Sequence, residues 1–154
     1  NLGVGGHQPR GWDELIALYN HATVIGSKIS CQFVNLDGSN AQIAGIALRS
    51  GTNTETDINA YIEGSNVKYV QLPPSGTGGA QKTVSYCFNN KFLGVSKPMA
   101  SENLRNTVSA NPTETAVFQC FGASPIGTDT NNIELLVTIE YVCVFTEPKT
   151  PVQS

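Results

Sequence analysis

The chain has 154 residues, of which nine are basic and twelve acidic, so its net charge is −3 and only 14% of it is charged. This length suits one compact domain with a single core. A protein that neutralises phosphates usually has a basic excess, and neither that excess nor a run of Lys or Arg occurs in the sequence. Neutral polar surfaces are typical of proteins that pack against other protein, although ordinary solubility explains the composition equally well.

The N-terminal segment predicts a short helix followed by a strand. Residues 1–10 are Gly-rich and irregular. Over residues 12–20, four apolar side chains recur at helical spacing: Trp12, Leu15, Ile16 and Tyr19. From Thr23 the period changes to two, which predicts a strand with one apolar face: Ile25, Ile29, Cys31 and Phe33.

The central region alternates short strands with loops. Asp37-Gly38 interrupts the first strand, and this loop either makes a hairpin or carries the chain to a second sheet. Residues 57–63 suggest one or two helical turns, with Thr56 as the N-cap and Gly64 past the end. The further strands expected here cover residues 43–48, 67–72, 83–88 and 115–121.

The clearest element is a long strand from Asn132 to Phe145. One face is expected to be apolar throughout: Ile133, Leu135, Val137, Ile139, Tyr141, Cys143 and Phe145. The opposite face carries Glu134, Thr138 and Glu140. Val142 and Val144 make the far end apolar on both faces, so another element or another subunit should cover it.

Together these elements predict an all-β fold, a single jelly-roll sandwich of two antiparallel sheets with short helices in long loops. The jelly-roll shell domain should span residues 11–149, followed by a loose tail at residues 150–154. Long ordered loops usually serve an interface or a ligand.

No motif in the sequence predicts catalysis, a metal or a cofactor. His7 and His21 have no nucleophile in a recognised setting, and both are expected to be ordinary histidines. Glu134 and Glu140 lie roughly 20 Å apart along an extended strand, too far for a pair of catalytic carboxylates.

The cysteines have no metal-binding spacing. Cys31, Cys87, Cys120 and Cys143 form no CxxC pair, and each lies in an apolar run, so buried free thiols are expected. A disulfide scaffold is not expected at this size. No signal peptide or membrane span is predicted, which favours assembly in a reducing compartment.

Two segments carry a resemblance to a known family. Residues 7–20 read HQPRGWDELIALYN and are followed by a VIGSKI stretch at residues 24–29. They resemble capsid proteins of small circular single-stranded DNA viruses that encode a replication initiator. The ending IEYVCVFTEPK at residues 139–149 is similar to the final strand of that group. The similarity extends to the jelly-roll shell domains of tombusvirus-like RNA viruses.

The resemblance implies a capsid protein of which sixty copies, or a multiple of sixty, form an icosahedral shell around a small genome. It implies a virion protein that is assembled in the host nucleus or cytoplasm, and it adds a host receptor to the candidate partners. A basic arm and a first strand, both known in the family, are expected upstream of residue 1. The helix residues Trp12, Leu15 and Tyr19 would pack on the sandwich or on a neighbour. The candidates for facing the genome are Lys28, Lys82, Lys91 and Lys97, for which a solvated surface is an equal explanation.

Two other classes of function remain open. A jelly-roll binding module, for carbohydrate or for receptor attachment, would need an exposed aromatic platform. Its candidate residues are Trp12, Tyr61, Tyr69 and Tyr86. A jelly-roll enzyme is disfavoured because the sequence has no metal motif.

Overall fold

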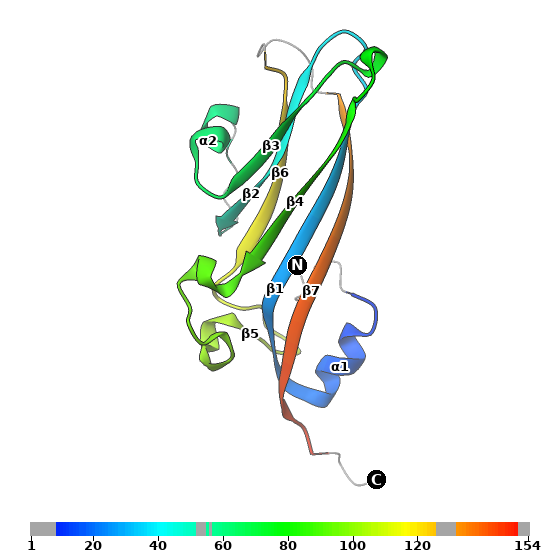
Figure 1. Cartoon of the computed structure of the whole chain (residues 1–154). Coiled ribbons are helices and arrows are strands. Elements are labelled where there is room, and N and C mark those ends of the chain that lie inside the picture. Colours follow the sequence, from blue (N-terminus) through cyan, green and yellow to red (C-terminus); the bar gives the residue numbers. More distant parts are fainter. Residues whose placement is uncertain (1–8, 52–54, 56, 126–131, 151–154) are drawn as a thin grey trace. The chain divides into compact units, whose positions relative to one another are not determined.

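The computed structural model describes residues 9–51, 55, 57–125 and 132–150. It shows a β-sandwich of two antiparallel sheets with short helices in the connections (Figure 1). The all-β prediction is confirmed, while the jelly-roll connectivity stays a prediction. The chain forms two compact units, which are described separately. The sandwich unit contains Lys28–Phe88 and Ala116–Glu140, and the helix unit contains the described residues of Asn1–Ser27, Asn89–Thr115 and Tyr141–Ser154.

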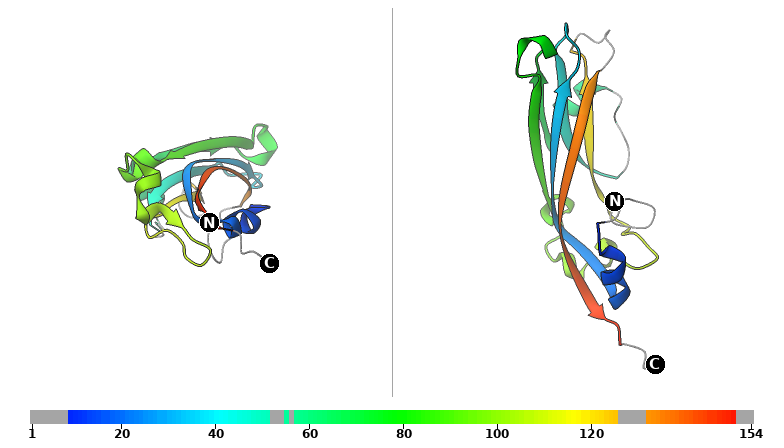
Figure 2. Two further views of the ribbon diagram at one scale, coloured as in Figure 1. Left: turned by 90° about the horizontal axis from the view of Figure 1, so that it is seen from below. Right: turned by 90° about the vertical axis from the view of Figure 1, so that its right-hand side faces the viewer.

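The sandwich unit holds the two sheets. One is three-stranded, in the order β3 (Val67–Leu72), β2 (Gln42–Ser50), β6 (Ala116–Ala123). In the other, β1 (Tyr19–Asn35) lies between β4 (Gln81–Asn89) and β7 (Ile133–Pro148), as Figures 1 and 2 show. The alternation in the sequence therefore produces two pleated faces that pack on each other.

The core of this unit is built from alternate residues of four strands. Ile29, Cys31 and Phe33 of β1 are fully buried, as the period-two pattern predicts. They pack with Ala44 and Ile46 of β2, Leu72 of β3 and Val84 of β4. Burying one such side chain stabilises the fold by about 1.5–3 kcal/mol.

The loop after β1 carries the chain to the second sheet and does not make a hairpin. The buried side chain of Asn35 donates from Nδ2 to the carbonyl oxygens of Asn40 (2.9 Å) and Pro73 (3.0 Å). Asp37 accepts from the backbone N–H groups of Ser39 (2.8 Å) and Asn40 (3.0 Å). These N–H groups lower the pKa of the Asp37 carboxyl. The loop is thus held by side chains that mimic a turn's own hydrogen bonds.

Helix α2 (Ile58–Glu63) packs on the outer face of the three-stranded sheet. Its N-cap is Asp57, whose carboxylate accepts from the N–H of Asn59 at 2.9 Å. The expected cap, Thr56, lies outside the described residues. An acidic N-cap satisfies a free N–H group as a threonine would, and the helix therefore begins one residue later than expected.

The face under α2 is aromatic. The Tyr61 ring stacks on Phe121 with centroids 4.5 Å apart, and its hydroxyl donates to Gln119 at 3.2 Å. Gly45 of β2 lies between Phe121 and Tyr69 of the flanking strands, and a Cβ there would collide with both side chains. A glycine at this position lets the two aromatic residues cover the strand.

In the helix unit, α1 spans Trp12–Leu18 and β1 begins at Tyr19, so the helix expected over residues 12–20 is shorter. Tyr19 is already extended, with φ −128° and ψ 155°, and belongs to the strand rather than to the helical stripe. Trp12 and Ile16 are buried and pack with Ala22. The Phe145 ring of β7 lies 5.5 Å from Trp12 and 5.6 Å from Tyr19, centroid to centroid.

The remaining elements are short. In the helix unit, β5 (Arg105–Asn106) pairs antiparallel with β1 at residues 22–23. The described residues also contain short 3₁₀ helices, η1 (Ser75–Thr77), η2 (Asn90–Leu93), η3 (Pro98–Ala100) and η4 (Glu102–Leu104). Over residues 102–106 the chain thus passes from η4 directly into β5.

Candidate assembly surface

Strand β7 forms one edge of the sandwich unit. Among the described strands it is paired only with β1, so the other side of its backbone has no strand beside it over residues 133–140. An unpaired edge exposes a row of N–H and C=O groups that can pair with another chain. Over Ile133–Glu140 there is no Pro and no Lys, which are residues that commonly protect an edge from such pairing.

The side chains along this edge are apolar and exposed. Ile133 packs against the core, and by the period of two, Leu135, Val137 and Ile139 share its face. They are nevertheless 43%, 42% and 38% exposed, and Leu136 on the opposite face is 65% exposed. We call Leu135, Leu136, Val137 and Ile139 the β7 strip. The face that the sequence predicted to be apolar is thus largely exposed, and the strip is not covered within the described part of this unit.

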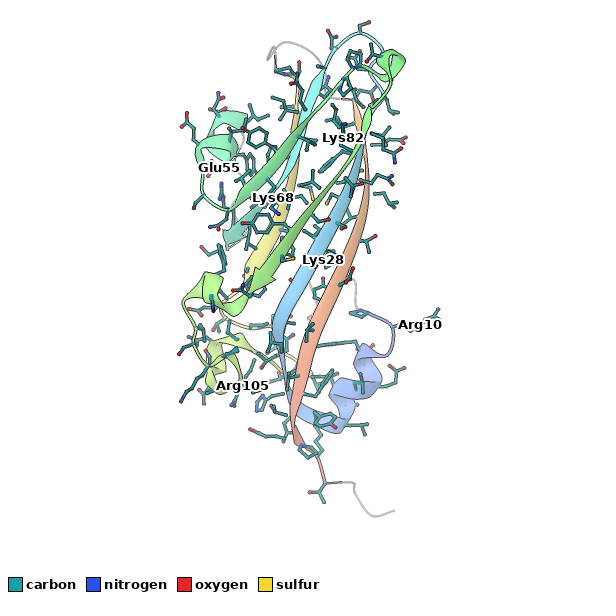
Figure 3. The ribbon with its side chains drawn as sticks, viewed as in Figure 1. Arg10, Lys28, Glu55, Lys68, Lys82 and Arg105 are labelled. Atoms are coloured by element: carbon teal, nitrogen blue, oxygen red, sulfur yellow. The ribbon has the colours of Figure 1, made fainter. Side chains whose placement is uncertain are left out.

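The charges beside the strip are few. Lys28 of β1 lies 3.7 Å from a carboxylate oxygen of Glu140 on β7, and both side chains are largely exposed. An exposed pair of this kind contributes at most about 1 kcal/mol to the stability of the fold. The pair also leaves the strand edge open to solvent. Figure 3 shows Lys28 and Lys82 on strands of the four-stranded sheet. Of the four lysines expected to face a genome, Lys28 and Lys82 belong to the sandwich unit, and Lys91 and Lys97 to the helix unit, where both are exposed.

The helix residues divide between burial and exposure. Trp12 is buried and Tyr19 is half-buried against Phe145, whereas Leu15 is 45% exposed. Leu18 of the same helix is exposed as well. The helix therefore buries Trp12 and Ile16 within its own unit and presents two leucines outward.

A polar cluster in the helix unit contains one of the two histidines. His21 lies 3.4 Å from Glu147, and Arg105 lies 3.8 Å from the same carboxylate. His7 lies outside the described residues. The described part of this cluster contains no Ser or Cys nucleophile hydrogen-bonded to His21, and it is a polar contact between β1, β5 and β7 within the unit.

The aromatic residues considered for a binding platform do not gather on a surface. Trp12 and Tyr61 are buried, and Tyr86 packs against the core beside Phe118. Only Tyr69 of the four is exposed. Sugar rings stack on flat, exposed aromatic side chains, and one tyrosine alone makes no platform.

Within residues 9–51, 55, 57–125 and 132–150, no three His, Cys, Asp or Glu side chains lie close enough to hold a metal ion. None of the helices found there is long and apolar enough to cross a membrane.

Burial raises the pKa of Cys143 to about 11 and that of Tyr141 above its usual range.

Neither a family model nor a curated protein matches this sequence. The fold and the β7 strip are therefore the observations that bear on function.

Proposed function

We propose that this chain is the shell domain of a viral capsid protein, whose copies self-assemble into an icosahedral particle around a small genome. The role is structural rather than enzymatic. Such a protein would be located in the virion after assembly in the nucleus or cytoplasm of the host cell.

The β7 strip is the observation that carries the proposal. Four exposed large apolar side chains, three on one face of β7 and Leu136 on the other, beside an edge with no described strand partner are costly for a solitary protein in water, because they favour uncontrolled association. A shell protein needs such a surface, since each copy is covered by other protein once the shell closes. The low charge of the sequence supports the same conclusion, because few ions must lose water on contact.

Two further features support the proposal. The segments at residues 7–29 and 139–149 resemble one group of viral capsid proteins, and the β-sandwich is compatible with a jelly-roll shell. Exposed Leu15 and Leu18 give the helix unit apolar surface for a neighbouring copy. Contact with nucleic acid through Lys28, Lys82, Lys91 and Lys97, or through a basic segment elsewhere in the protein, belongs to the proposal.

Light scattering over a range of protein concentrations, followed by negative-stain microscopy, tests the proposal. Wild-type protein is expected to form particles of viral dimensions, and Leu136→Glu should reduce their yield at least tenfold by placing a charge on the β7 strip. Tyr69→Glu, which changes a residue that is 51% exposed on the other sheet, is the control and should assemble. Both residues are exposed, so circular dichroism should show folded protein in each case.

A wild-type protein that stays monomeric at high concentration contradicts the proposal. So does a folded Leu136→Glu protein that assembles as well as Tyr69→Glu. If the monomer instead binds a glycan array, the carbohydrate-binding alternative replaces the capsid.

A further inference from the structure

Two thiols face each other in the core of the sandwich unit, one from each sheet. Cys31 is on β1 and Cys120 is on β6, and their Sγ atoms lie 3.4 Å apart. A disulfide needs the two sulfurs to approach to about 2.05 Å, a movement of a little over 1 Å. We propose that Cys31 and Cys120 are a reversible oxidation site, at which a peroxide converts the two thiols into a disulfide that joins the two sheets.

The surroundings of the two thiols assign them different roles. Cys31 is fully buried, whereas Cys120 is only partly buried. Burial raises the pKa of both thiols. The hydrogen bond between them raises the pKa of Cys31 further, to about 12, and acts to lower that of Cys120. Because Cys120 is the less buried of the two residues, it is the thiol that attacks the peroxide, and Cys31 is the resolving thiol.

The reaction balances with hydrogen peroxide as the oxidant. The Cys120 thiolate attacks one peroxide oxygen, the O–O bond breaks, and the departing hydroxide takes up the proton that Cys120 lost, which leaves a sulfenic acid and one water. The sulfur of Cys31 then attacks Sγ of Cys120. The S–O bond breaks, and the hydroxide leaves as a second water with the proton of Cys31. Two thiols lose two electrons, and the peroxide gains them.

The position of the pair determines what the bond does. It connects residues 89 apart in sequence and in different sheets, so it restricts the unfolded chain and stops the sheets from separating. Because raised pKa values keep both sulfurs mostly protonated at neutral pH, oxidation is slow and becomes faster as the pH rises. The pair therefore remains reduced in a reducing compartment and closes when the protein meets peroxide outside it.

A variant that keeps only this pair gives the cleanest test. Cys87→Ser/Cys143→Ser removes the exposed thiol of β4 and the thiol of the helix unit. After treatment with hydrogen peroxide, the intact mass should fall by two hydrogen atoms, and a maleimide should no longer label the unfolded protein. Peptide mapping should link residues 31 and 120 within one chain, dithiothreitol should reverse the change, and the oxidised form should have the higher melting temperature.

Single replacements in the same background separate the two roles. With Cys31→Ser, Cys120 should stop at a sulfenic acid that dimedone traps. With Cys120→Ser, Cys31 should remain a free thiol. If either replacement prevents folding, the peptide map of peroxide-treated wild-type protein decides. The proposal is overturned if folded protein keeps both thiols after peroxide, if Cys120 is oxidised to a sulfinic acid while Cys31 stays free, or if the link joins two chains.

Discussion

The two long edges of the sandwich unit differ in how side chains cover them. At the β3/β4 edge, Lys68 donates from Nζ to the carbonyl of Ser85 at 3.2 Å, and its ammonium lies 5.4 Å from the centre of the Tyr86 ring. The side chain of Asn35 adds a bond to Pro73, just after β3. At the edge formed by β7, the strip is exposed and the backbone has no described strand beside it. The same alternation of apolar residues thus gives a closed core at one edge and a surface that suits another protein chain at the other.

A matched pair of Leu→Ala substitutions tests this comparison most strongly. Leu72→Ala in β3 removes a fully buried side chain and should lower the free energy of unfolding by about 3–4 kcal/mol. Leu136→Ala in the β7 strip should lower it by less than about 0.5 kcal/mol in the monomer, because that side chain is already in water. Urea unfolding followed by circular dichroism measures both. Equal losses at the two sites would mean that β7 is covered in solution.

The next largest effect is expected at Asn35, which ties β1 to the end of β3. Asn35→Ala leaves the partly buried carbonyl groups of Asn40 and Pro73 without their donor and should cost about 2 kcal/mol. Tyr86→Phe is the control at the same edge. It removes only the long, exposed hydrogen bond of 3.4 Å from the Tyr86 hydroxyl to Asn66 and should change stability by less than about 0.5 kcal/mol. Urea midpoints that rank the two variants in the opposite order would contradict this account of the edge.

The buried face of β1 follows from the sequence because its side chains alternate between the core and the other face over residues 29–35. The pattern at Ile29, Cys31 and Phe33 gave the correct buried face, and Asp37-Gly38 correctly marked the end of β1. Whether that loop makes a hairpin or changes sheets depends on contacts with Pro73, 38 residues from Asn35, which no local pattern contains. The end of α1 was placed too late because Tyr19 continues the helical spacing, although tertiary contact with Phe145 holds it in a strand.

The candidate site was only half predictable. The period of β7 identifies which residues share a face, but not whether anything covers that face, since coverage is decided by strands far away in the chain. In the same way, Cys31 and Cys120 each look like a lone buried thiol, and only the packing of β1 against β6 brings their sulfurs to 3.4 Å. Which residues of a strand share a face can be read from neighbouring positions in the sequence. Contact between two sheets cannot, because it joins residues that are far apart in the chain.

The loop that carries the chain between the sheets should make stability depend on pH. The N–H groups of Ser39 and Asn40 lower the pKa of Asp37 below 3.8 in the folded protein. The carboxylate therefore contributes its full stabilisation above 3.8 and loses it as the pH falls through the lower, folded value. Asp37→Asn should flatten the acid limb of a plot of urea midpoint against pH. An unchanged acid limb would show that Asp37 does not hold this loop closed.

The smallest effect is expected at the ion pair beside the β7 strip. Lys28 and Glu140 are 3.7 Å apart and largely exposed, so Lys28→Met should change the free energy of unfolding by less than about 1 kcal/mol, and less still at high salt. A double-mutant cycle with Glu140→Gln, measured by urea unfolding at low and high salt, isolates the pair from the separate effects of each change. A coupling well above about 1 kcal/mol that salt does not weaken would mean that the pair is shielded from water. The β7 edge would then already be covered in solution, by a partner that excludes water from both side chains.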